Sequence, residues 1–254
     1  MSRVIERAKN NKAPGYDRIP VEFFKNATPL FLTMLTIAFN CILNTGQVPL
    51  SFKQSIIFPL FKTGDPQNPE NYRGIAFLNA IYKIFAGVIL DRLTKWVERE
   101  NLLSEFQTGF RKGYSTMDNI FCLTSIARIY QKMGKTLYAF FVDFKAAFDS
   151  ILRLALIYKL SNLGMSSKMI RLLANLFDES KSAVWNGDSL SSWFETYAGV
   201  KQGCVLSPLL FALFIDDLND CLSGGVTICD THVKLLMYVD YIVLVADSIP
   251  ASLK

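Results

Sequence analysis

The stretch "LLMYVDYIVLV" (residues 235–245) places one aspartate inside an otherwise apolar run. Asp240 has only hydrophobic or tyrosine neighbours for five residues on either side. An ionised carboxylate that is buried alone costs several kcal/mol, so a residue in this setting needs a compensating partner. The run itself predicts two short strands within residues 233–246 that meet near Asp240 and Tyr241.

A second aspartate has the same setting. In "YAFFVDFKAAFD" (residues 138–149), Asp143 ends an apolar run over 137–144 that predicts a buried strand. Two strand-end carboxylates from distant segments can meet in one sheet and share cations. Oxygen ligands of this kind suit Mg²⁺, and two such ions about 4 Å apart can serve phosphoryl transfer. The alternative, in which both aspartates are strand-end caps or ion-pair partners, stays open from spacing alone.

The charge is distributed unevenly along the chain. The net charge is +5, from 27 Lys and Arg against 22 Asp and Glu. Residues 1–112 carry 15 basic and 9 acidic side chains, a balance of +6, which leaves 12 and 13 for residues 113–254. A basic first half suits a polyanion, although solvated helix faces explain part of the excess.

Several patterns predict the remaining elements. Apolar periodicity indicates helices over 21–45 (followed by Gly46), 76–99, 115–133, 150–163, 166–177 and 207–222, the last with Ser207 as its cap. "QSIIFPLF" (54–61) predicts a strand in which Pro59 marks an edge or a bulge, and residues 62–74 are rich in turn formers. "SAVWNG" (182–187) and "SWFETYAGV" (192–200) predict a hairpin. This mixture predicts an α+β fold.

Other classes of protein are disfavoured. The N-terminus lacks the apolar core of a signal peptide, and no apolar run reaches the roughly 18 residues of a membrane span. Five cysteines without a CxxC pair, and a single histidine, argue against a zinc site and for a reducing, intracellular setting. We expect no membrane partner.

Six ordered blocks resemble the reverse transcriptase domain of non-LTR retrotransposons of the jockey or LINE-like type. They are "NKAPGYDRIPVEFFK" (11–25), the block over 55–93, "EFQTGFRKGYSTMDNI" (105–120), "FFVDFKAAFDS" (140–150), "GVKQGCVLSPLLFALFIDDL" (199–218) and "LLMYVDYIVLVADS" (235–248). Single matches of this length are weak, but six in the right order are specific.

The resemblance implies a right-hand polymerase, mainly fingers over residues 1–136 and palm over 137–254, with an antiparallel palm sheet and packed helices. It implies DNA synthesis on an RNA template from the 3′-hydroxyl of a DNA primer. The implied cofactor is two Mg²⁺ ions, with Mn²⁺ as an alternative, and the substrates are deoxynucleoside triphosphates. Asp143 and Asp240 would be the catalytic metal ligands. A functional protein of this family is expected in the nucleus.

The resemblance also implies a nucleotide site. Arg73 and Lys62 would grip the triphosphate, a task for which a guanidinium is suited because it stays charged and binds phosphate oxygens in pairs. The ring of Phe148, five residues after Asp143, would exclude a ribose 2′-hydroxyl. Gln202 would bond near the nucleotide or template. The neighbouring Asp149 is interpreted as a cap for the following helix or as a substrate contact.

The template and primer would contact a further group of residues. Arg111 and Lys112 are candidates for salt-dependent contacts with the template backbone. Gly199 and Gly203 would permit close approach of the backbone, with Gly203 at the template–primer side. For each cation the alternative is a surface salt bridge, which is more plausible for Lys62 than for Arg73.

One departure from the family concerns catalysis. Tyr241 replaces the second aspartate of the family motif, and a phenol is neutral at pH 7 and a poor Mg²⁺ ligand. We also expect the thumb to lie outside this chain, which should leave an exposed apolar patch. Three hypotheses follow: a polymerase domain, a catalytically impaired or dead remnant that at most binds nucleic acid, and a remnant without function. The sequence leaves the oligomeric state unknown.

Overall fold

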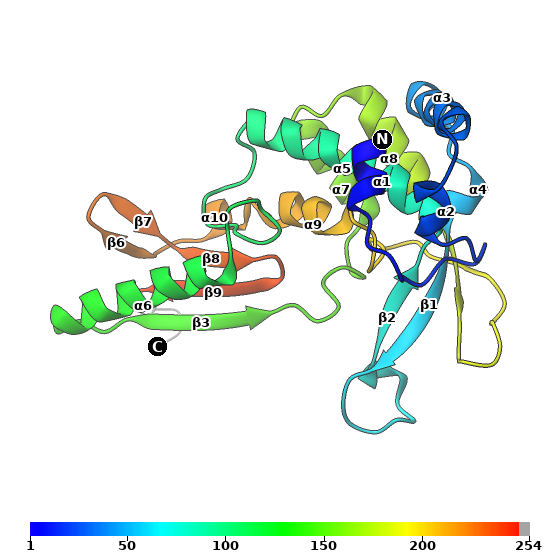
Figure 1. Cartoon of the computed structure of the whole chain (residues 1–254). Coiled ribbons are helices and arrows are strands. Elements are labelled where there is room, and N and C mark those ends of the chain that lie inside the picture. Colours follow the sequence, from blue (N-terminus) through cyan, green and yellow to red (C-terminus); the bar gives the residue numbers. More distant parts are fainter. Residues whose placement is uncertain (249–254) are drawn as a thin grey trace. The chain divides into compact units, whose positions relative to one another are not determined.

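The computed structural model describes residues 1–248, whose backbone divides into two interleaved units. Unit 1 contains residues 1–96 and 148–207, and unit 2 contains residues 97–147 and those from 208 onward. Figure 1 shows the helices and strands of both. The division into fingers and palm at residue 136 stays a prediction.

Unit 1 holds most of the helices and a four-stranded sheet. Its elements are α1 (Ser2–Arg7), α2 (Val21–Lys25), α3 (Pro29–Thr45), α4 (Leu50–Lys53), β1 (Gln54–Phe61), the 3₁₀ turn η1 (Pro69–Asn71), β2 (Tyr72–Phe77), most of α5 (Ala80–Arg99), α7 (Arg153–Asn162), α8 (Ser167–Phe177), β4 (Lys181–Val184) and β5 (Phe194–Glu195).

The sheet of unit 1 has the order β2-β1-β4-β5. β1 pairs antiparallel with β2 and parallel with β4, whereas β4 and β5 form the predicted antiparallel hairpin. Pairing with β4 ends at Ile57, so Pro59, opposite Gly74 of β2, has a sheet neighbour on one side only. β1 is thus an interior strand and not the edge strand or bulge that Pro59 suggested, but Pro59 lies in the part of β1 beyond β4, where its missing N–H leaves no ladder bond unmade.

Two sequence features set the ends of α3. The expected helix over 21–45 is split, because Pro29 has no N–H to donate in a helix interior and stands instead at the first turn of α3. The Thr28 hydroxyl accepts a hydrogen bond from the Phe31 N–H at 3.3 Å. The predicted stop at Gly46 is confirmed, since that residue adopts the left-handed conformation (φ 73°) that ends many helices.

The core of unit 1 contains a group of aromatic rings and a group of leucines. Phe52 packs on Tyr82 and Phe85, with ring centroids 5.4 Å apart in both pairs, and Phe39 lies 5.0 Å from Phe85. α7 and α8 bury a second set of side chains: Leu156, Leu160, Leu172, Leu173 and Leu176. These contacts hold α4, α5 and the strand β1 that follows α4 in a fixed arrangement.

Unit 2 contains the predicted strands around Asp143 and Asp240. Its elements are the end of α5, α6 (Thr116–Lys132), β3 (Tyr138–Asp143), α9 (Ser207–Ile215, after its first residue), α10 (Leu218–Cys221), β6 (Val226–Ile228), β7 (Thr231–Val233), β8 (Leu235–Tyr238) and β9 (Tyr241–Ala246). An antiparallel sheet has the order β3-β9-β8, and β6 and β7 form a separate hairpin.

Helices cover both faces of the β8–β9 hairpin. On one face, Ile126 and Tyr130 of α6 pack with Leu236 and Val245 in a buried cluster. On the other, Met237 and Ile242 pack with side chains from α9 and α10. Figure 1 shows α6 running beside β3, β8 and β9. The hairpin is therefore held from two sides, as its uninterrupted apolar sequence requires.

The prediction of a buried strand over 137–144 is wrong about burial. β3 forms, but it lies at the edge of its sheet, and the side chains of Phe140 and Phe141 are 67% and 68% exposed. Successive side chains of a strand point to opposite faces, so both faces of β3 carry exposed apolar surface. Phe121 and Met117 of α6 are also exposed. Unit 2 therefore carries exposed apolar side chains, and that a thumb would cover them stays a prediction.

Three further expectations are corrected. The helix over 207–222 is two helices, α9 and α10, and the Ser207 hydroxyl donates to the Lys201 carbonyl at 2.8 Å instead of capping. β2 begins inside the stretch expected to be a turn and extends to residue 77, where a helix was expected. The two helices expected over 150–163 and 166–177 are confirmed. None of the helices described is long and apolar enough to cross a membrane.

Candidate functional site

Asp143 and Tyr241 face each other across two paired strands. In the antiparallel register of β3 and β9, Asp143 is the partner of Tyr241. β8 and β9 pair Tyr238 with Tyr241, which leaves Val239 and Asp240 as the two residues of the turn between them. The two predicted aspartates, almost a hundred positions apart, therefore lie at the same end of one three-stranded sheet.

The burial of these carboxylates differs from the expectation. Asp143 is exposed and Asp240 is half-buried, because Asp143 ends an edge strand and Asp240 stands in a turn. Tyr241 is 57% exposed. Neither carboxylate carries the desolvation cost of a buried charge, so the apolar flanks of Asp240 reflect the packing of the hairpin on both faces, not the burial of Asp240 itself.

Two carboxylates lie at this end of the sheet, one on Asp143 at the end of β3 and one on Asp240 in the turn. Mg²⁺ in enzymes is often bound by one or two protein carboxylates together with water and substrate phosphates. Across residues 1–248 no group of three or more His, Cys, Asp or Glu side chains comes together as a metal site. Tyr241 occupies the position directly opposite Asp143, where a third carboxylate would complete such a group.

Unit 1 brings Asp149 together with two of the residues that the resemblance assigns to nucleotide binding, Arg73 and Gln202. Gln202 Nε2 donates a hydrogen bond to Asp149 Oδ2 at 2.8 Å, and the Gln202 carbonyl accepts from the Ala76 N–H of β2 at 2.7 Å. Partial desolvation raises the pKa of the Asp149 carboxyl, while the hydrogen bond from Gln202 and the charge of Arg73 oppose that rise. Arg73, Asp149 and Gln202 thus form one polar cluster.

The interpretation of Asp149 as a helix cap is wrong. α7 begins at Arg153 with Leu152 at its N-cap position and no side-chain capping bond. Asp149 instead accepts from Gln202, a partner 53 residues further along the chain. Its carboxylate therefore orients the Gln202 side chain beside Arg73.

Glycines allow the loop of residues 199–203 to pack closely on neighbouring backbone of unit 1, while the role of Gly203 toward template and primer stays a prediction. Gly199 has φ +78°, and a Cβ there would lie 2.7 Å from the Asp149 carbonyl oxygen. Gly203 has φ +109°, and a Cβ there would lie 2.7 Å from the Ala76 oxygen. The Val200 N–H donates to the Phe148 carbonyl at 2.7 Å, which ties the loop to the segment bearing Phe148 and Asp149.

The remaining cations have mixed surroundings. Lys62 is exposed at the end of β1, where its N–H donates to the Asn71 carbonyl at 2.9 Å. Arg111 Nη1 donates to the carbonyls of Ser104 (2.6 Å) and Gln107 (3.1 Å), and its guanidinium lies 4.6 Å from the ring centroid of Tyr114. Part of the Arg111 guanidinium thus supports its own loop. The roles in template or nucleotide binding stay predictions.

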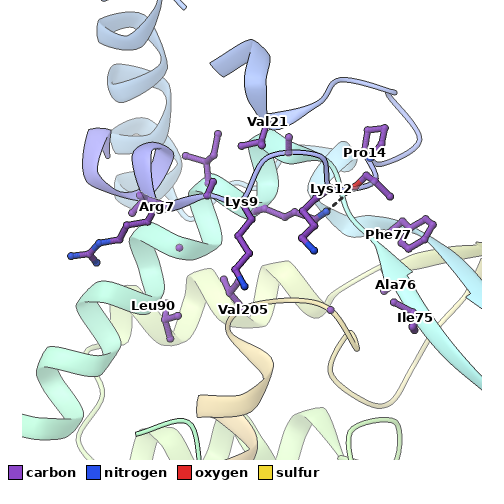
Figure 2. Close-up of a pocket in the computed structure, with 18 of the residues that line it drawn as sticks. Arg7, Lys9, Lys12, Pro14, Val21, Ile75, Ala76, Phe77, Leu90 and Val205 are labelled. Atoms are coloured by element: carbon purple, nitrogen blue, oxygen red, sulfur yellow. Dashed lines mark hydrogen bonds between the residues drawn. The ribbon is translucent and has the colours of Figure 1, made fainter. Parts of the chain in front are cut away.

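A cavity of about 650 Å³ in unit 1 was not expected from the sequence. Figure 2 shows Arg7, Lys9 and Lys12 of the N-terminal segment beside apolar lining residues such as Phe77 and Val205. The remaining cation of the lining, Lys83, donates to the Ala13 carbonyl at 3.2 Å, and burial lowers the pKa of its ammonium group.

The charges around this cavity are mostly positive. Arg7 pairs loosely with Asp91 at 3.9 Å. The other lining residues are apolar or small apart from Lys9, Lys12 and Lys83. Cations and apolar side chains line the same cavity, so it is suited to a ligand that carries both negative charges and apolar groups. The concentration of basic residues in the first half of the sequence is the one signal that could have indicated it.

A buried lysine was also missed. Lys201, in the same loop as Gln202, donates to the carbonyls of Phe52 (3.2 Å) and Lys53 (2.9 Å) and lies 5.6 Å from the centroid of the Tyr82 ring. Burial lowers the pKa of its ammonium group to about 8. This lysine anchors the loop to the end of α4, which no sequence pattern indicated.

Comparison with known proteins places these observations in a family. Residues 62–254 match the family described as reverse transcriptase (RNA-dependent DNA polymerase). The probable RNA-directed DNA polymerase from transposon X-element of Drosophila melanogaster is 30% identical over 219 residues, which cover 86% of this chain and 24% of that protein. The RNA-directed DNA polymerase from mobile element jockey of Drosophila funebris is 27% identical, over 98% of this chain and 27% of that protein.

The fold has counterparts among solved structures. A structure of apo telomerase from Candida tropicalis, truncated from its C-terminal domain, matches with a TM-score of 0.55 and 15% identity, over 85% of this chain and 49% of that chain. The mixed α/β architecture is thus similar to that of telomerase. The chain spans about a quarter of the length of the curated relatives above. The resemblance seen in the ordered motifs is confirmed, and the chain belongs to the reverse transcriptase (RNA-dependent DNA polymerase) family, as a domain whose relatives are encoded by non-LTR retrotransposons.

Proposed function

We propose that this domain carries out RNA-directed DNA synthesis. The 3′-hydroxyl oxygen of a DNA primer forms a bond to the α-phosphorus of a deoxynucleoside triphosphate, the bond to the bridging oxygen of the β-phosphate breaks, and pyrophosphate leaves. The observation that carries the proposal is the strand register that sets Asp143 beside the turn of Asp240. Residues 1–136 would act mainly as fingers and residues 137–254 as palm.

Asp143 and Asp240 would hold the divalent cations in this proposal. Mg²⁺, or Mn²⁺ in its place, lowers the pKa of an attacking hydroxyl and stabilises charge on a leaving oxygen. The two carboxylates of the chain contribute negative charge and oxygen ligands at one end of the sheet. Two protein carboxylates suffice for a cation that takes its other ligands from phosphates and water, and they hold a second cation less firmly.

The polar cluster of unit 1 would receive the nucleotide. Arg73, in β2, stays charged and can bind two phosphate oxygens, and Lys62, just after the paired strand β1, adds a point charge. Gln202, held by Asp149, is oriented for a hydrogen bond to the base or sugar. Phe148 would act by size, rejecting a ribose 2′-hydroxyl.

The template and primer would contact Arg111, Lys112 and Gly203 together with the basic edge of the cavity in unit 1. Telomerase from Candida tropicalis has also been solved in complex with a TWJ fragment of telomeric RNA, which makes RNA a reasonable partner to propose here. A nuclear location would follow from reverse transcription at a chromosomal primer.

Primer extension on an RNA template tests the proposal. Incorporation should require Mg²⁺ or Mn²⁺ and should be abolished by Asp143→Ala, which removes one of the two carboxylates. Undiminished incorporation in that variant would refute the assignment. Incorporation that appears only in Tyr241→Asp would place the defect in the tyrosine and support the rest of the site.

A second function is favoured by Tyr241 itself. With a neutral phenol opposite Asp143, the domain can retain nucleic-acid binding through its basic half while polymerising poorly or not at all. RNA binding that weakens steeply with salt, without extension in either wild type or Tyr241→Asp, would support this binding function. Extension by the wild-type chain as efficient as that of Tyr241→Asp would exclude it.

A further inference from the structure

The segment 106–109 forms the outer neighbour of β8. β8 lies at the edge of its sheet, opposite to β3. The Met237 N–H donates to the Phe106 carbonyl at 2.8 Å, and the Met237 carbonyl accepts from the Thr108 N–H at 3.0 Å. The same carbonyl accepts from Thr108 Oγ1 and Asn119 Nδ2, both at 3.1 Å. The strand that leads into the Asp240 turn is thereby fixed two residues before the turn begins.

Gln107 extends this attachment into the turn itself. Its side chain is fully buried, and its Oε1 accepts from the N–H groups of Gly109 and Val239, both at 3.0 Å. Two donors on one oxygen settle the orientation of the amide, because Nε2 cannot accept. Within residues 1–248 Nε2 has no hydrogen-bond partner. A buried amide nitrogen without a hydrogen-bond partner lowers stability. The stabilising contribution of Gln107 therefore comes from the two N–H groups that its oxygen binds.

Val239 is the strained residue of the turn. Its φ is 60°, a left-handed conformation that is an outlier for a β-branched residue and is therefore strained. Gly109 is packed against it, since a Cβ at Gly109 would lie 2.3 Å from Val239 Cγ2 and 2.5 Å from Val239 N. The bond from Val239 to Gln107 therefore stabilises a conformation that the residue disfavours alone.

We infer that Gln107 is a positioning residue for Asp240: its amide oxygen holds Val239 in the left-handed conformation, and that conformation sets the direction of the next side chain. If Val239 relaxes to an extended conformation, the peptide between Val239 and Asp240 rotates, and the direction of the Asp240 side chain changes at the end of the sheet where Asp143 also lies. This inference rests on the proposed function, because the direction of Asp240 matters only if its carboxylate binds a cation with Asp143.

The test measures Mn²⁺ binding by electron paramagnetic resonance, with amide hydrogen exchange of residues 236–241 and thermal unfolding on the same samples. Gln107→Met keeps length and removes both the oxygen and the unpaired nitrogen. We expect it to weaken Mn²⁺ binding about tenfold or more, as is usual when the partner of a metal ligand is lost, and to speed exchange at the turn. Gln107→Glu keeps an acceptor and should retain the slow exchange.

A matched control separates positioning from general stability. Lys234→Met removes two bonds to backbone carbonyls in the same unit, to Asn219 (3.3 Å) and Leu222 (2.9 Å), without touching the turn. It should lower the unfolding temperature at least as much as Gln107→Met, yet leave Mn²⁺ affinity unchanged. If Gln107→Met does not fold, Gly109→Ala displaces the turn with Gln107 intact and should weaken Mn²⁺ binding by a similar factor.

Two failures are distinguishable. Wild-type affinity in Gln107→Met and Gly109→Ala, with Mn²⁺ binding lost in Asp143→Ala, would overturn the role of Gln107 and leave the metal site standing. Equal Mn²⁺ binding by wild type and Asp143→Ala, or no binding by either the wild type or Tyr241→Asp, would remove the metal site and the inference with it.

Discussion

Asp143 and Tyr241 are direct partners across β3 and β9, so their side chains share one face of the sheet. A carboxylate at position 241 would stand opposite Asp143 and next to Asp240. The tyrosine instead places a neutral, half-exposed ring there. With Tyr241 the end of the sheet has two carboxylates, and with an aspartate at position 241 it would have three. We expect this difference to change how much Mg²⁺ stabilises the domain.

Tyr241→Asp should make stability depend on Mg²⁺. Without the cation, like charges directly opposite each other on a sheet destabilise it, by about 1 kcal/mol or less. With the cation, binding to the native state stabilises it by mass action, so the unfolding temperature should rise more than in wild type. Thermal unfolding in chelator and in Mg²⁺ measures both effects.

The control for this prediction is Tyr241→Asn, which has nearly the same shape as the aspartate variant without its charge. It should show neither the loss of stability in chelator nor the extra gain in Mg²⁺. An identical Mg²⁺ response in wild type, Tyr241→Asn and Tyr241→Asp would mean that position 241 does not face a cation site.

Local patterns predicted the backbone around the site well. The apolar run over 235–245 predicted the β8–β9 hairpin, because two short apolar segments that meet at a polar residue are typical of two paired strands joined by a turn. Gly46 was placed correctly since glycine readily adopts the left-handed conformation that ends many helices. The resemblance, not the pattern, supplied the roles of Asp143 and Asp240.

Long-range contacts were not predictable from these patterns. The apolar residues of β3 indicated burial, but burial depends on which elements flank the strand, and β3 lies at an edge. Asp149 was assigned to the nearest helix, whereas its partner is Gln202. Gln107 gave no signal at all, because a polar residue in a loop looks the same in sequence whether it is solvated or fully buried.

Arg73→Ala should weaken triphosphate binding far more than RNA binding. Hydrogen bonds to charged groups contribute about 1.5–3 kcal/mol, so the loss of the guanidinium should weaken nucleotide affinity roughly 10- to 100-fold. Arg92→Ala, which removes an exposed cation from α5, is the charge-matched control and should have little effect on the nucleotide. Titration of each variant with triphosphate and with RNA compares them. A loss confined to RNA would reassign Arg73 to the template.

Gly199→Ala should damage both stability and the nucleotide cluster. Its φ of +78° disfavours any Cβ, and the Cβ would meet the backbone of Asp149 at 2.7 Å. Gly164→Ala is the matched control, with φ +85° and nothing within 4 Å of the added atom. The free energy of unfolding should fall by roughly 1 kcal/mol in the control and by more in Gly199→Ala. If the free energy of unfolding falls equally in Gly199→Ala and Gly164→Ala, the backbone of Asp149 moves aside without an energetic penalty.

Lys201 should make stability rise with pH in a defined window. Its pKa is about 8 in the folded chain against 10.5 for the unperturbed group, so between these values the unfolded state binds more protons than the folded state. The free energy of unfolding therefore increases as pH rises through about 8. Burial of Lys83 adds a contribution of the same sign, and Tyr82, whose pKa is raised above 10.0, opposes it only above that pH.

Lys201→Met isolates the contribution of this lysine. The variant loses the bonds to the Phe52 and Lys53 carbonyls, but it also loses the titrating group, so its stability should vary less between about pH 8 and pH 10 than that of wild type. Urea unfolding at several pH values in this window gives the two slopes. Parallel slopes would contradict the lowered pKa of Lys201, which is attributed mainly to desolvation of its ammonium group, with a smaller contribution from the charge of Arg153.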